Sequence, residues 1–179
     1  MPNLKPPLPG PFRHRMIVIG NSGSGKTTFA AQIAASLRCP HVDLDTVYWQ
    51  DQIRLEKRVE PAAKQMVAAL AARPHWVIEG VYGWLADVAA PRATALIWLN
   101  LPWAECKAGL EARGPGYSPS QAEYDALLAW AERYWSRDTP SSEAGHRKIF
   151  DAFSGYKVAL SRRADVAALA GRLAGTEPS

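Results

Sequence analysis

The chain has 179 residues, 47% of them hydrophobic and 21% charged, which is ordinary for one soluble globular domain. A net charge of +4 suits phosphate ligands but does not by itself indicate nucleic-acid binding. The two cysteines lack metal-ligand spacing and are typical of reduced thiols. No apolar run approaches the roughly 18 residues of a membrane span. We therefore expect a cytoplasmic protein without a membrane partner, monomeric by default, in which residues 1–14 form a Pro-rich arm.

The most informative stretch is Gly20 to Thr27, which fits GxxxxGK[ST] at every fixed position and follows the apolar run Met16 to Ile19. Glycines let successive backbone N–H groups point at one anion, and Lys26 reaches the terminal phosphates. The Thr27 hydroxyl is a ligand for Mg²⁺, and the helix that starts here directs its positive end at the phosphates. The sequence therefore predicts an ATP site made by Asn21, Ser22, Gly23, Ser24, Gly25, Lys26, Thr27 and Thr28.

Apolar runs and helical spacings alternate along the rest of the chain. They predict strands at 15–19, 41–44, 76–78, 95–99 and 157–160, and helices at 28–37, 61–72, 103–112, 120–135 and 163–173. The helix at 120–135, capped by Ser118 or Ser120, would bury one side formed by Tyr124, Leu127, Leu128, Ala131 and Trp135. This order predicts a three-layer α/β fold with a doubly wound, five-stranded parallel sheet that binds ligands at the carboxyl ends of its strands.

Acidic residues stand at two of those carboxyl ends. Asp43 and Asp45 lie two positions apart, so in an extended chain both carboxylates would project to the same side. One could hold Mg²⁺ through water while the other orients an acceptor hydroxyl or acts as a base. Glu79 ends the third strand and is the further candidate for the outer shell of the metal. A helix cap, a turn or a solvated carboxylate is the structural alternative for each of them.

The runs IVIGNSGSGKTTFAAQIA and PHVDLDTVYWQ, within 16–50, together with WVIEGVYG at 76–83 and ALIWLNLP at 95–102, resemble the bacterial adenylate-kinase-related P-loop proteins often labelled DNA topology modulation proteins. The segment from His146 to Leu169 also fits that family. The resemblance implies a nucleotide-kinase-like P-loop fold with a short lid and mobile parts that close on the acceptor. Within residues 15–175 it places an acceptor-side segment at about 46–75 and a lid at about 113–147.

The same resemblance assigns roles to individual residues. Glu79 corresponds to the acidic group that helps to hold Mg²⁺ through water, and Asp43 and Asp45 match the paired aspartates that shikimate-kinase-like relatives use near metal and acceptor. Lid arginines normally clamp the moving phosphoryl group. Arg113, Arg133 and Arg137 are the candidates here, with the last two one helical turn apart on one face, where a solvated surface is the alternative.

The acceptor side is less specific. Tyr48, Trp49, Tyr82 and Trp84 could stack on an acceptor ring, although packing is favoured for Trp49 and Trp84 and Tyr82 stays open. Arg54, Arg58 and Arg92 are candidates for an acceptor phosphate, and Ser161 to Arg163 for adenine contact, with Ser161 alternatively a helix N-cap.

The interpretation that follows is an ATP- and Mg²⁺-dependent phosphotransferase acting on a small or nucleotide acceptor, with Asp45 orienting that acceptor. One alternative is a nucleotide-binding regulator that acts on DNA or on a protein, although no continuous basic face or recognition helix is evident. The other is slow ATP hydrolysis without a physiological acceptor.

Overall fold

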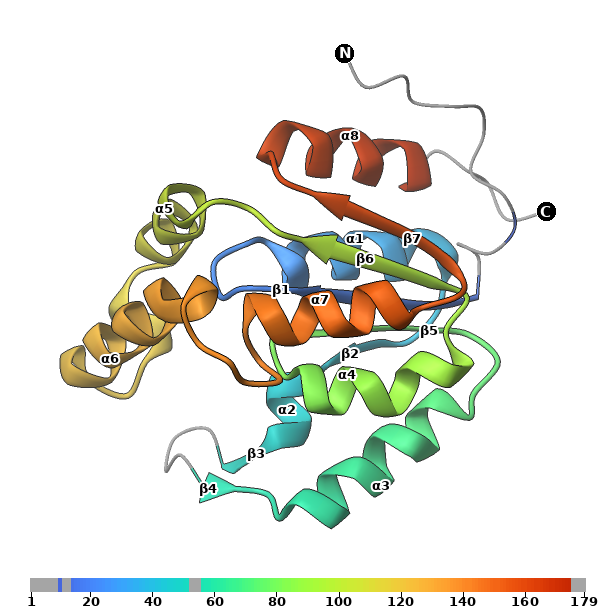
Figure 1. The fold of residues 1–179 in the computed structure, drawn as a ribbon, viewed down its shortest axis with the longest axis horizontal. Coiled ribbons are helices and arrows are strands. Elements are labelled where there is room, and N and C mark those ends of the chain that lie inside the picture. Colours follow the sequence, from blue (N-terminus) through green and yellow to red (C-terminus); the bar gives the residue numbers. More distant parts are fainter. Residues whose placement is uncertain (1–9, 11–13, 52–55, 175–179) are drawn as a thin grey trace.

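A five-stranded parallel sheet forms the centre of the molecule (Figure 1). The computed structural model describes residues 10, 14–51 and 56–174. The sheet has the order β2-β5-β1-β6-β7, with β1 at Arg15–Gly20, β2 at His41–Asp43, β5 at Trp76–Gly80, β6 at Ala95–Leu99 and β7 at Tyr156–Leu160. Since β1 lies between β5 and β6, the loop that leaves β1 opens at the middle of the sheet's carboxyl edge.

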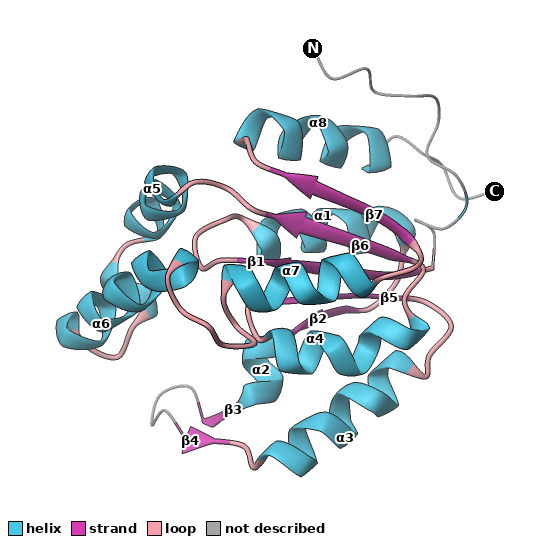
Figure 2. Ribbon diagram, viewed as in Figure 1, coloured by secondary structure: helices cyan, strands magenta, loops and turns pink. Residues whose placement is uncertain are grey.

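Helices cover both faces of the sheet (Figure 2). One face carries α1 (Lys26–Leu37) and α8 (Arg163–Ala174), and the other carries α3 (Glu60–Ala71), α4 (Gly83–Ala89) and α7 (Glu143–Ala152). The remaining elements are α2 (Leu44–Tyr48), the hairpin strands β3 (Trp49–Asp51) and β4 (Glu56–Lys57), α5 (Trp103–Arg113), α6 (Gln121–Glu132), and the 3₁₀ turns η2 (Ala90–Arg92), η3 (Pro115–Tyr117) and η4 (Arg133–Trp135). Helices α5 and α6 project beyond the carboxyl edge of the sheet (Figure 1).

The three layers follow from strands that are apolar on both sides. Every residue of β5 and β6 is buried, as expected for a parallel sheet with helices on both faces. In the centre of the sheet Ile17 lies beside Ile78 and Leu96, and these residues belong to the core between the sheet and α3, α4 and α7. A second core lies between the sheet and α1 and α8. The predicted fold class is thus confirmed, with its topological switch point at the P-loop.

The five predicted strands are all present, with small changes of boundary. The predicted helix at 120–135 is wrong in its last turn. Ser120 is the N-cap and accepts a hydrogen bond from the Glu123 amide, but α6 ends at Glu132 and a 3₁₀ turn follows. This change turns Tyr134 into the core and leaves Trp135 38% exposed, so Trp135 is not on the buried side.

Four elements were not predicted: α2, the β3–β4 hairpin, α4 and α7. Apart from α7 they are short; α7 spans ten residues and is amphipathic, so its helical pattern was present in the sequence but was not recognised. Residues 1–9 and 11–13 of the expected arm lie outside the described residues, and the division into acceptor and lid segments stays a prediction. Among the described helices, none combines the length and the apolar character that crossing a bilayer requires.

Candidate active site

The P-loop connects β1 to α1 and lines a cleft of about 1200 Å³. Gly23 and Gly25 have φ values of 78° and 91°, in the left-handed region that favours glycine. Lys26 begins α1, and its Nζ donates a hydrogen bond to the carbonyl oxygen of Asn21 at 2.9 Å. The loop therefore curls around its own lysine, with the amide end of α1 directed at the cleft, which is the arrangement that binds phosphate.

The predicted ATP residues divide into two groups. Those that line the cleft are Ser22, Gly23, Gly25, Lys26, Thr27 and Thr28. The side chains of Asn21 and Ser24 are buried instead. Asn21 Nδ2 donates to the carbonyl oxygen of Ala131 at 2.8 Å, so this side chain connects the P-loop to the end of α6. Only the backbone of these two residues remains for a ligand.

The P-loop also packs against α5 through glycine. A Cβ atom at Gly23 would lie 2.0 Å from the carbonyl oxygen of Cys106, and one at Gly109 would lie 2.2 Å from the carbonyl oxygen of Gly23. Arg163, at the start of α8, donates to the Gly23 carbonyl at 3.2 Å and to the Glu105 carbonyl at 2.8 Å. Loop, α5 and α8 thus form one closely packed wall of the cleft.

Asp43 and Asp45 both line the cleft, but not through the predicted extended geometry. The strand ends at Asp43, which is the N-cap of α2, and its Oδ1 accepts a hydrogen bond from the Asp45 amide at 2.8 Å. The expectation of two carboxylates on one side of a strand was wrong because the cap turns the chain into a helix. Asp43 is thus the helix cap that was its structural alternative, and it also lines the cleft, while its role toward Mg²⁺ stays a prediction.

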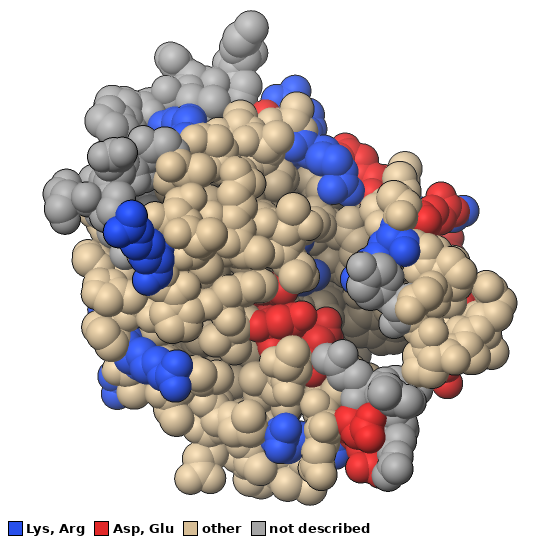
Figure 3. Space-filling model, turned by 180° about the vertical axis from the view of Figure 1, so that it is seen from behind, with Lys and Arg blue, Asp and Glu red and all other residues tan. Residues whose placement is uncertain are grey.

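The two aspartates are poorly solvated. Burial, reinforced by the charges of Glu79 and Asp45, raises the pKa of Asp43 to about 6. Burial also raises the pKa of Asp45, against the opposing charge of Lys26. The charge of Lys26 opposes the rise in pKa at both aspartates but does not outweigh it. Seen from behind, acidic side chains lie beside the hollow that separates the body of the molecule from the projecting part that contains α5 and α6 (Figure 3).

Glu79 ends β5 and is 1% exposed. Burial alone would raise its pKa, but His41, Lys26 and Thr27 outweigh that effect and hold the pKa below its usual range. Nε2 of His41 lies 3.6 Å from Oε1 of Glu79, too far for a hydrogen bond, and this Oε1 has no other hydrogen-bond partner. Glu79 is thus a buried carboxylate with one oxygen left for a water or a cation.

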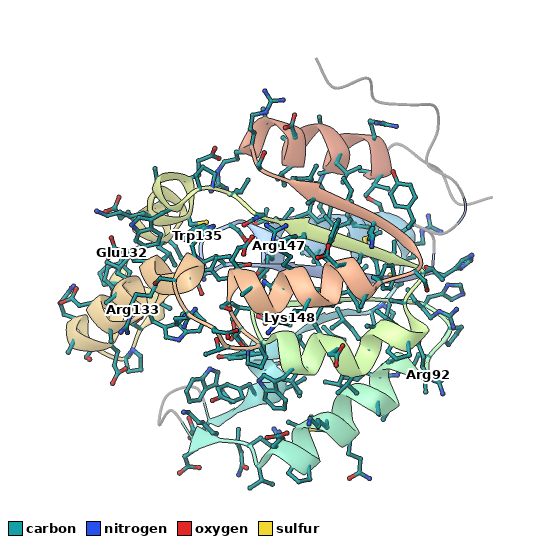
Figure 4. The ribbon with its side chains drawn as sticks, in the orientation of Figure 1. Arg92, Glu132, Arg133, Trp135, Arg147 and Lys148 are labelled. Atoms are coloured by element: carbon teal, nitrogen blue, oxygen red, sulfur yellow. The ribbon has the colours of Figure 1, made fainter. Side chains whose placement is uncertain are left out.

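The arginines do not all reach the cleft. Arg113 and Arg137 line it. The Arg137 guanidinium stacks 3.9 Å from the ring centre of Trp130 and donates to the Ser141 carbonyl at 3.1 Å, which leaves its buried Nε without a hydrogen-bond partner. Arg133 is exposed and donates to the Ala129 carbonyl. It lies just after α6, in the part of the molecule that projects beyond the sheet (Figure 4). The expected shared face of Arg133 and Arg137 was wrong because α6 ends at Glu132, before both residues, and a 3₁₀ turn begins at Arg133.

On the acceptor side, all four predicted aromatic residues, Tyr48, Trp49, Tyr82 and Trp84, line the cleft. Three predicted arginines do not. Arg54 lies outside the described residues, Arg58 donates to the Val47 carbonyl, and Arg92 is exposed on η2 at the other end of the molecule (Figure 4).

After the last strand, Arg163 reaches the cleft, whereas Arg162 is paired with Asp165. Ser161 is not the N-cap, because α8 begins at Arg163 and the first helical amides bond to the Arg162 carbonyl.

Several cleft residues escaped the sequence analysis, among them Lys57 in β4 and Trp130 in α6. Lys57 belongs to a two-residue strand with no periodic signal. Trp130 stands in α6, which ends at Glu132, so no regular helical spacing connects it to Arg137.

The fold is similar to those of several solved small-molecule kinases. No family model matches the chain. It is similar to a gluconokinase from Sinorhizobium meliloti 1021, with 19% identity, a TM-score of 0.56, and coverage of 91% of this chain and 93% of that one. It is also similar to shikimate kinase from Bacteroides thetaiotaomicron, with 18% identity, a TM-score of 0.54, and coverage of 89% and 95%.

A sugar kinase from Janibacter sp. HTCC2649 gives a TM-score of 0.52 at 18% identity, over 88% of this chain and 90% of that one. In sequence, 68 residues are 29% identical to the uncharacterized protein YqaC of Bacillus subtilis (strain 168). That match spans 37% of this chain and 38% of YqaC. The structural likenesses establish the fold, and the sequence match points to a distant relative.

Proposed function

We propose that the protein is an ATP-dependent phosphotransferase that moves the γ-phosphoryl group to a small acceptor. The observation that carries this proposal is the P-loop: left-handed glycines, a helix that begins at Lys26, and a cleft that opens from this loop. The kinase folds to which the chain is similar support it. Backbone amides of 22–27 and the Lys26 ammonium would hold the phosphates of ATP.

The donors at the P-loop fit Mg²⁺. Thr27 lies exposed at the start of α1, Asp43 lines the same cleft, and Glu79 keeps a buried oxygen that lacks a hydrogen-bond partner and lies 3.6 Å from His41. Within the described residues no three His, Cys, Asp or Glu side chains form a cage of their own. Mg²⁺ suits such a site because it keeps several waters and takes ligands from ATP itself. Bound there, it would neutralise phosphate charge.

Asp45 and the arginines would serve the acceptor. Asp45 lies in the first turn of α2, within the electrostatic reach of both Lys26 and Arg113. Its carboxylate would orient the accepting hydroxyl and take its proton. Arg113 and Arg137 come from the opposite wall and would neutralise the moving phosphoryl group, because phosphoryl transfer depends mostly on positioning and charge. Arg133 is left out of this clamp because it lies outside the cleft.

The test is ATP binding by Lys26→Ala beside the control Lys64→Ala. Lys64 is an exposed α3 residue, paired with Glu60. Calorimetry with ATP and Mg²⁺ should detect binding to the wild type and the control and none to Lys26→Ala. ADP release should then rise with at least one compound from a panel of gluconate, shikimate, nucleosides and nucleoside monophosphates. Normal ATP affinity in Lys26→Ala would contradict the proposal.

A further inference from the structure

Four aromatic side chains form what we call the aromatic corner of the cleft: Tyr48, Trp49, Tyr82 and Trp84. They come from the end of α2, the start of β3 and the turn between β5 and α4. Tyr48 is the centre, with ring centroids 4.8 Å from Trp49, 4.2 Å from Tyr82 and 6.1 Å from Trp84. All four are half-buried rather than enclosed in the core. The corner therefore presents ring surface to the cleft.

Hydrogen bonds hold the corner and join it to the reacting end of the cleft. Trp49 Nε1 donates to the Tyr82 hydroxyl at 3.1 Å. That hydroxyl in turn hydrogen-bonds the carboxylate of Asp45. Because the Trp49 indole can only donate and the Asp45 carboxylate can only accept, the Tyr82 hydroxyl accepts a hydrogen bond from Trp49 and donates one to Asp45. If the ring of a ligand stacked on these side chains, a substituent attached to that ring would lie beside Asp45.

Asp45 suits a neutral accepting group. Asp43 and Asp45 both line this end of the cleft, and the cations Lys26 and Arg113 are close enough to Asp45 to favour its carboxylate form. A phosphate placed directly against Asp45 would meet its negative charge, whereas a hydroxyl would donate a hydrogen bond to it. Lys57 has its Nζ 5.8 Å from the Tyr48 and Trp49 centroids and so lies over the rings.

We propose that the acceptor is a nucleoside-like molecule, in which a flat heterocycle stacks in the aromatic corner and a sugar hydroxyl meets Asp45. This inference rests on the proposed phosphotransfer. The hydroxyl oxygen forms a bond to the γ-phosphorus while the bond from that phosphorus to the β–γ bridging oxygen breaks. The electron pair of the broken bond stays on ADP, and the hydroxyl proton passes to the Asp45 carboxylate and then to water.

Two measurements on the full chain test the acceptor class. Adenosine, guanosine, cytidine and thymidine are titrated against tryptophan fluorescence, then each is assayed for ADP release with ATP and Mg²⁺. AMP, gluconate and shikimate are run in parallel. We expect at least one nucleoside to quench the fluorescence and to raise ADP release at least tenfold over ATP alone. We expect AMP, gluconate and shikimate to do neither. Turnover that prefers AMP, gluconate or shikimate would overturn the inference.

Variants at Trp49 separate stacking from folding. Trp49→Leu should raise the nucleoside KM at least tenfold with a smaller change in kcat, because it removes ring surface, whereas Asp45 keeps its hydrogen bond from the Tyr82 hydroxyl. Trp49→Phe keeps a ring and should recover most of the affinity. The control Trp135→Leu changes an exposed tryptophan outside the cleft and should leave KM unchanged. An unchanged KM in Trp49→Leu would also overturn the inference.

The outcome is distinguishable from failure of the proposed function itself. If the wild type binds ATP, and Lys26→Ala does not, but no nucleoside quenches fluorescence or supports ADP release, the acceptor class is wrong and the nucleotide site stands. If the wild type binds no ATP, the phosphotransfer proposal fails first.

Discussion

At the scale of single residues, the two neighbouring aspartates have different duties. Asp43 caps α2, and its Oδ1 is engaged by the Asp45 amide, which fixes the carboxylate at the strand end. Asp45 belongs to the helix, and its carboxylate meets the Tyr82 hydroxyl. Capping therefore positions one carboxylate toward the P-loop and the other toward the aromatic corner. The DxD spacing builds the site through a turn of helix and not through an extended strand.

This division predicts that Asp45→Asn separates binding from transfer. Asn keeps the size of the side chain but cannot take a proton, so transfer should fall by about 10²-fold or more, the usual range for a lost general base. ATP affinity should stay within about twofold, because the P-loop is unchanged. ADP release and calorimetry measure the two effects. Asp87→Asn, an exposed aspartate of α4, is the control. Equal turnover in both variants would remove Asp45 from the mechanism.

At the scale of elements, the P-loop is shaped by α5 as much as by its own glycines. Gly109 in α5 faces the Gly23 carbonyl so closely that a Cβ would come within 2.2 Å of that oxygen. The contact is backbone against backbone and leaves no flexible group to move aside. In the middle of a helix glycine costs about 1 kcal/mol relative to alanine, a cost that close approach of the P-loop explains.

A pair of glycine substitutions tests this contact. Gly109→Ala should lower both ATP affinity and melting temperature, since the clash costs about 1–3 kcal/mol and displaces the loop. Gly171→Ala in α8 is the matched control, because a Cβ there meets nothing within 4 Å. That variant should gain up to about 1 kcal/mol of stability and keep its ATP affinity. Thermal unfolding and calorimetry report both. A stabilised Gly109→Ala with normal ATP binding would argue against the packing described.

What the sequence predicted well were elements with strong local signals. The P-loop, the five strands and the doubly wound order follow from apolar runs, glycine offsets and helix spacing. The missed elements are decided by tertiary contacts. After α6 ends, Tyr134 turns into the core, where its hydroxyl forms hydrogen bonds with Trp98 and His146. No local sequence pattern predicts that the helix ends there. The positions of Arg133 and Arg137 depended on that break, which is why only Arg113 and Arg137 of the three predicted arginines reach the cleft.

At the scale of the whole molecule, a buried polar chain joins strands and helices behind the site. The Trp98 Nε1 of β6 donates to the Tyr134 hydroxyl at 3.1 Å, and that hydroxyl lies 2.6 Å from Nδ1 of His146 in α7. His146 Nε2 lies 3.0 Å from the carbonyl oxygen of Val81. Because a carbonyl only accepts, Nε2 carries the proton, and Nδ1 accepts from the Tyr134 hydroxyl. A neutral His146 satisfies every member of this chain.

This buried hydrogen-bond network makes the stability of the fold depend on pH. Burial lowers the pKa of His146 to about 3, whereas an unfolded histidine titrates near 6.5. Between these values the unfolded chain binds more protons, so the stabilisation by neutral His146 is complete above about pH 6.5 and is lost as pH falls toward 3.

His146→Gln keeps an amide donor for the Val81 carbonyl but does not titrate. It should therefore be less stable than the wild type at pH 7.5, and this difference should shrink by about 1 kcal/mol by pH 5.5. Urea unfolding followed by circular dichroism at both pH values measures the difference directly. Because carboxylates titrate alike in both proteins, their contribution cancels, and two parallel stability curves would show that His146 is not held neutral by this network.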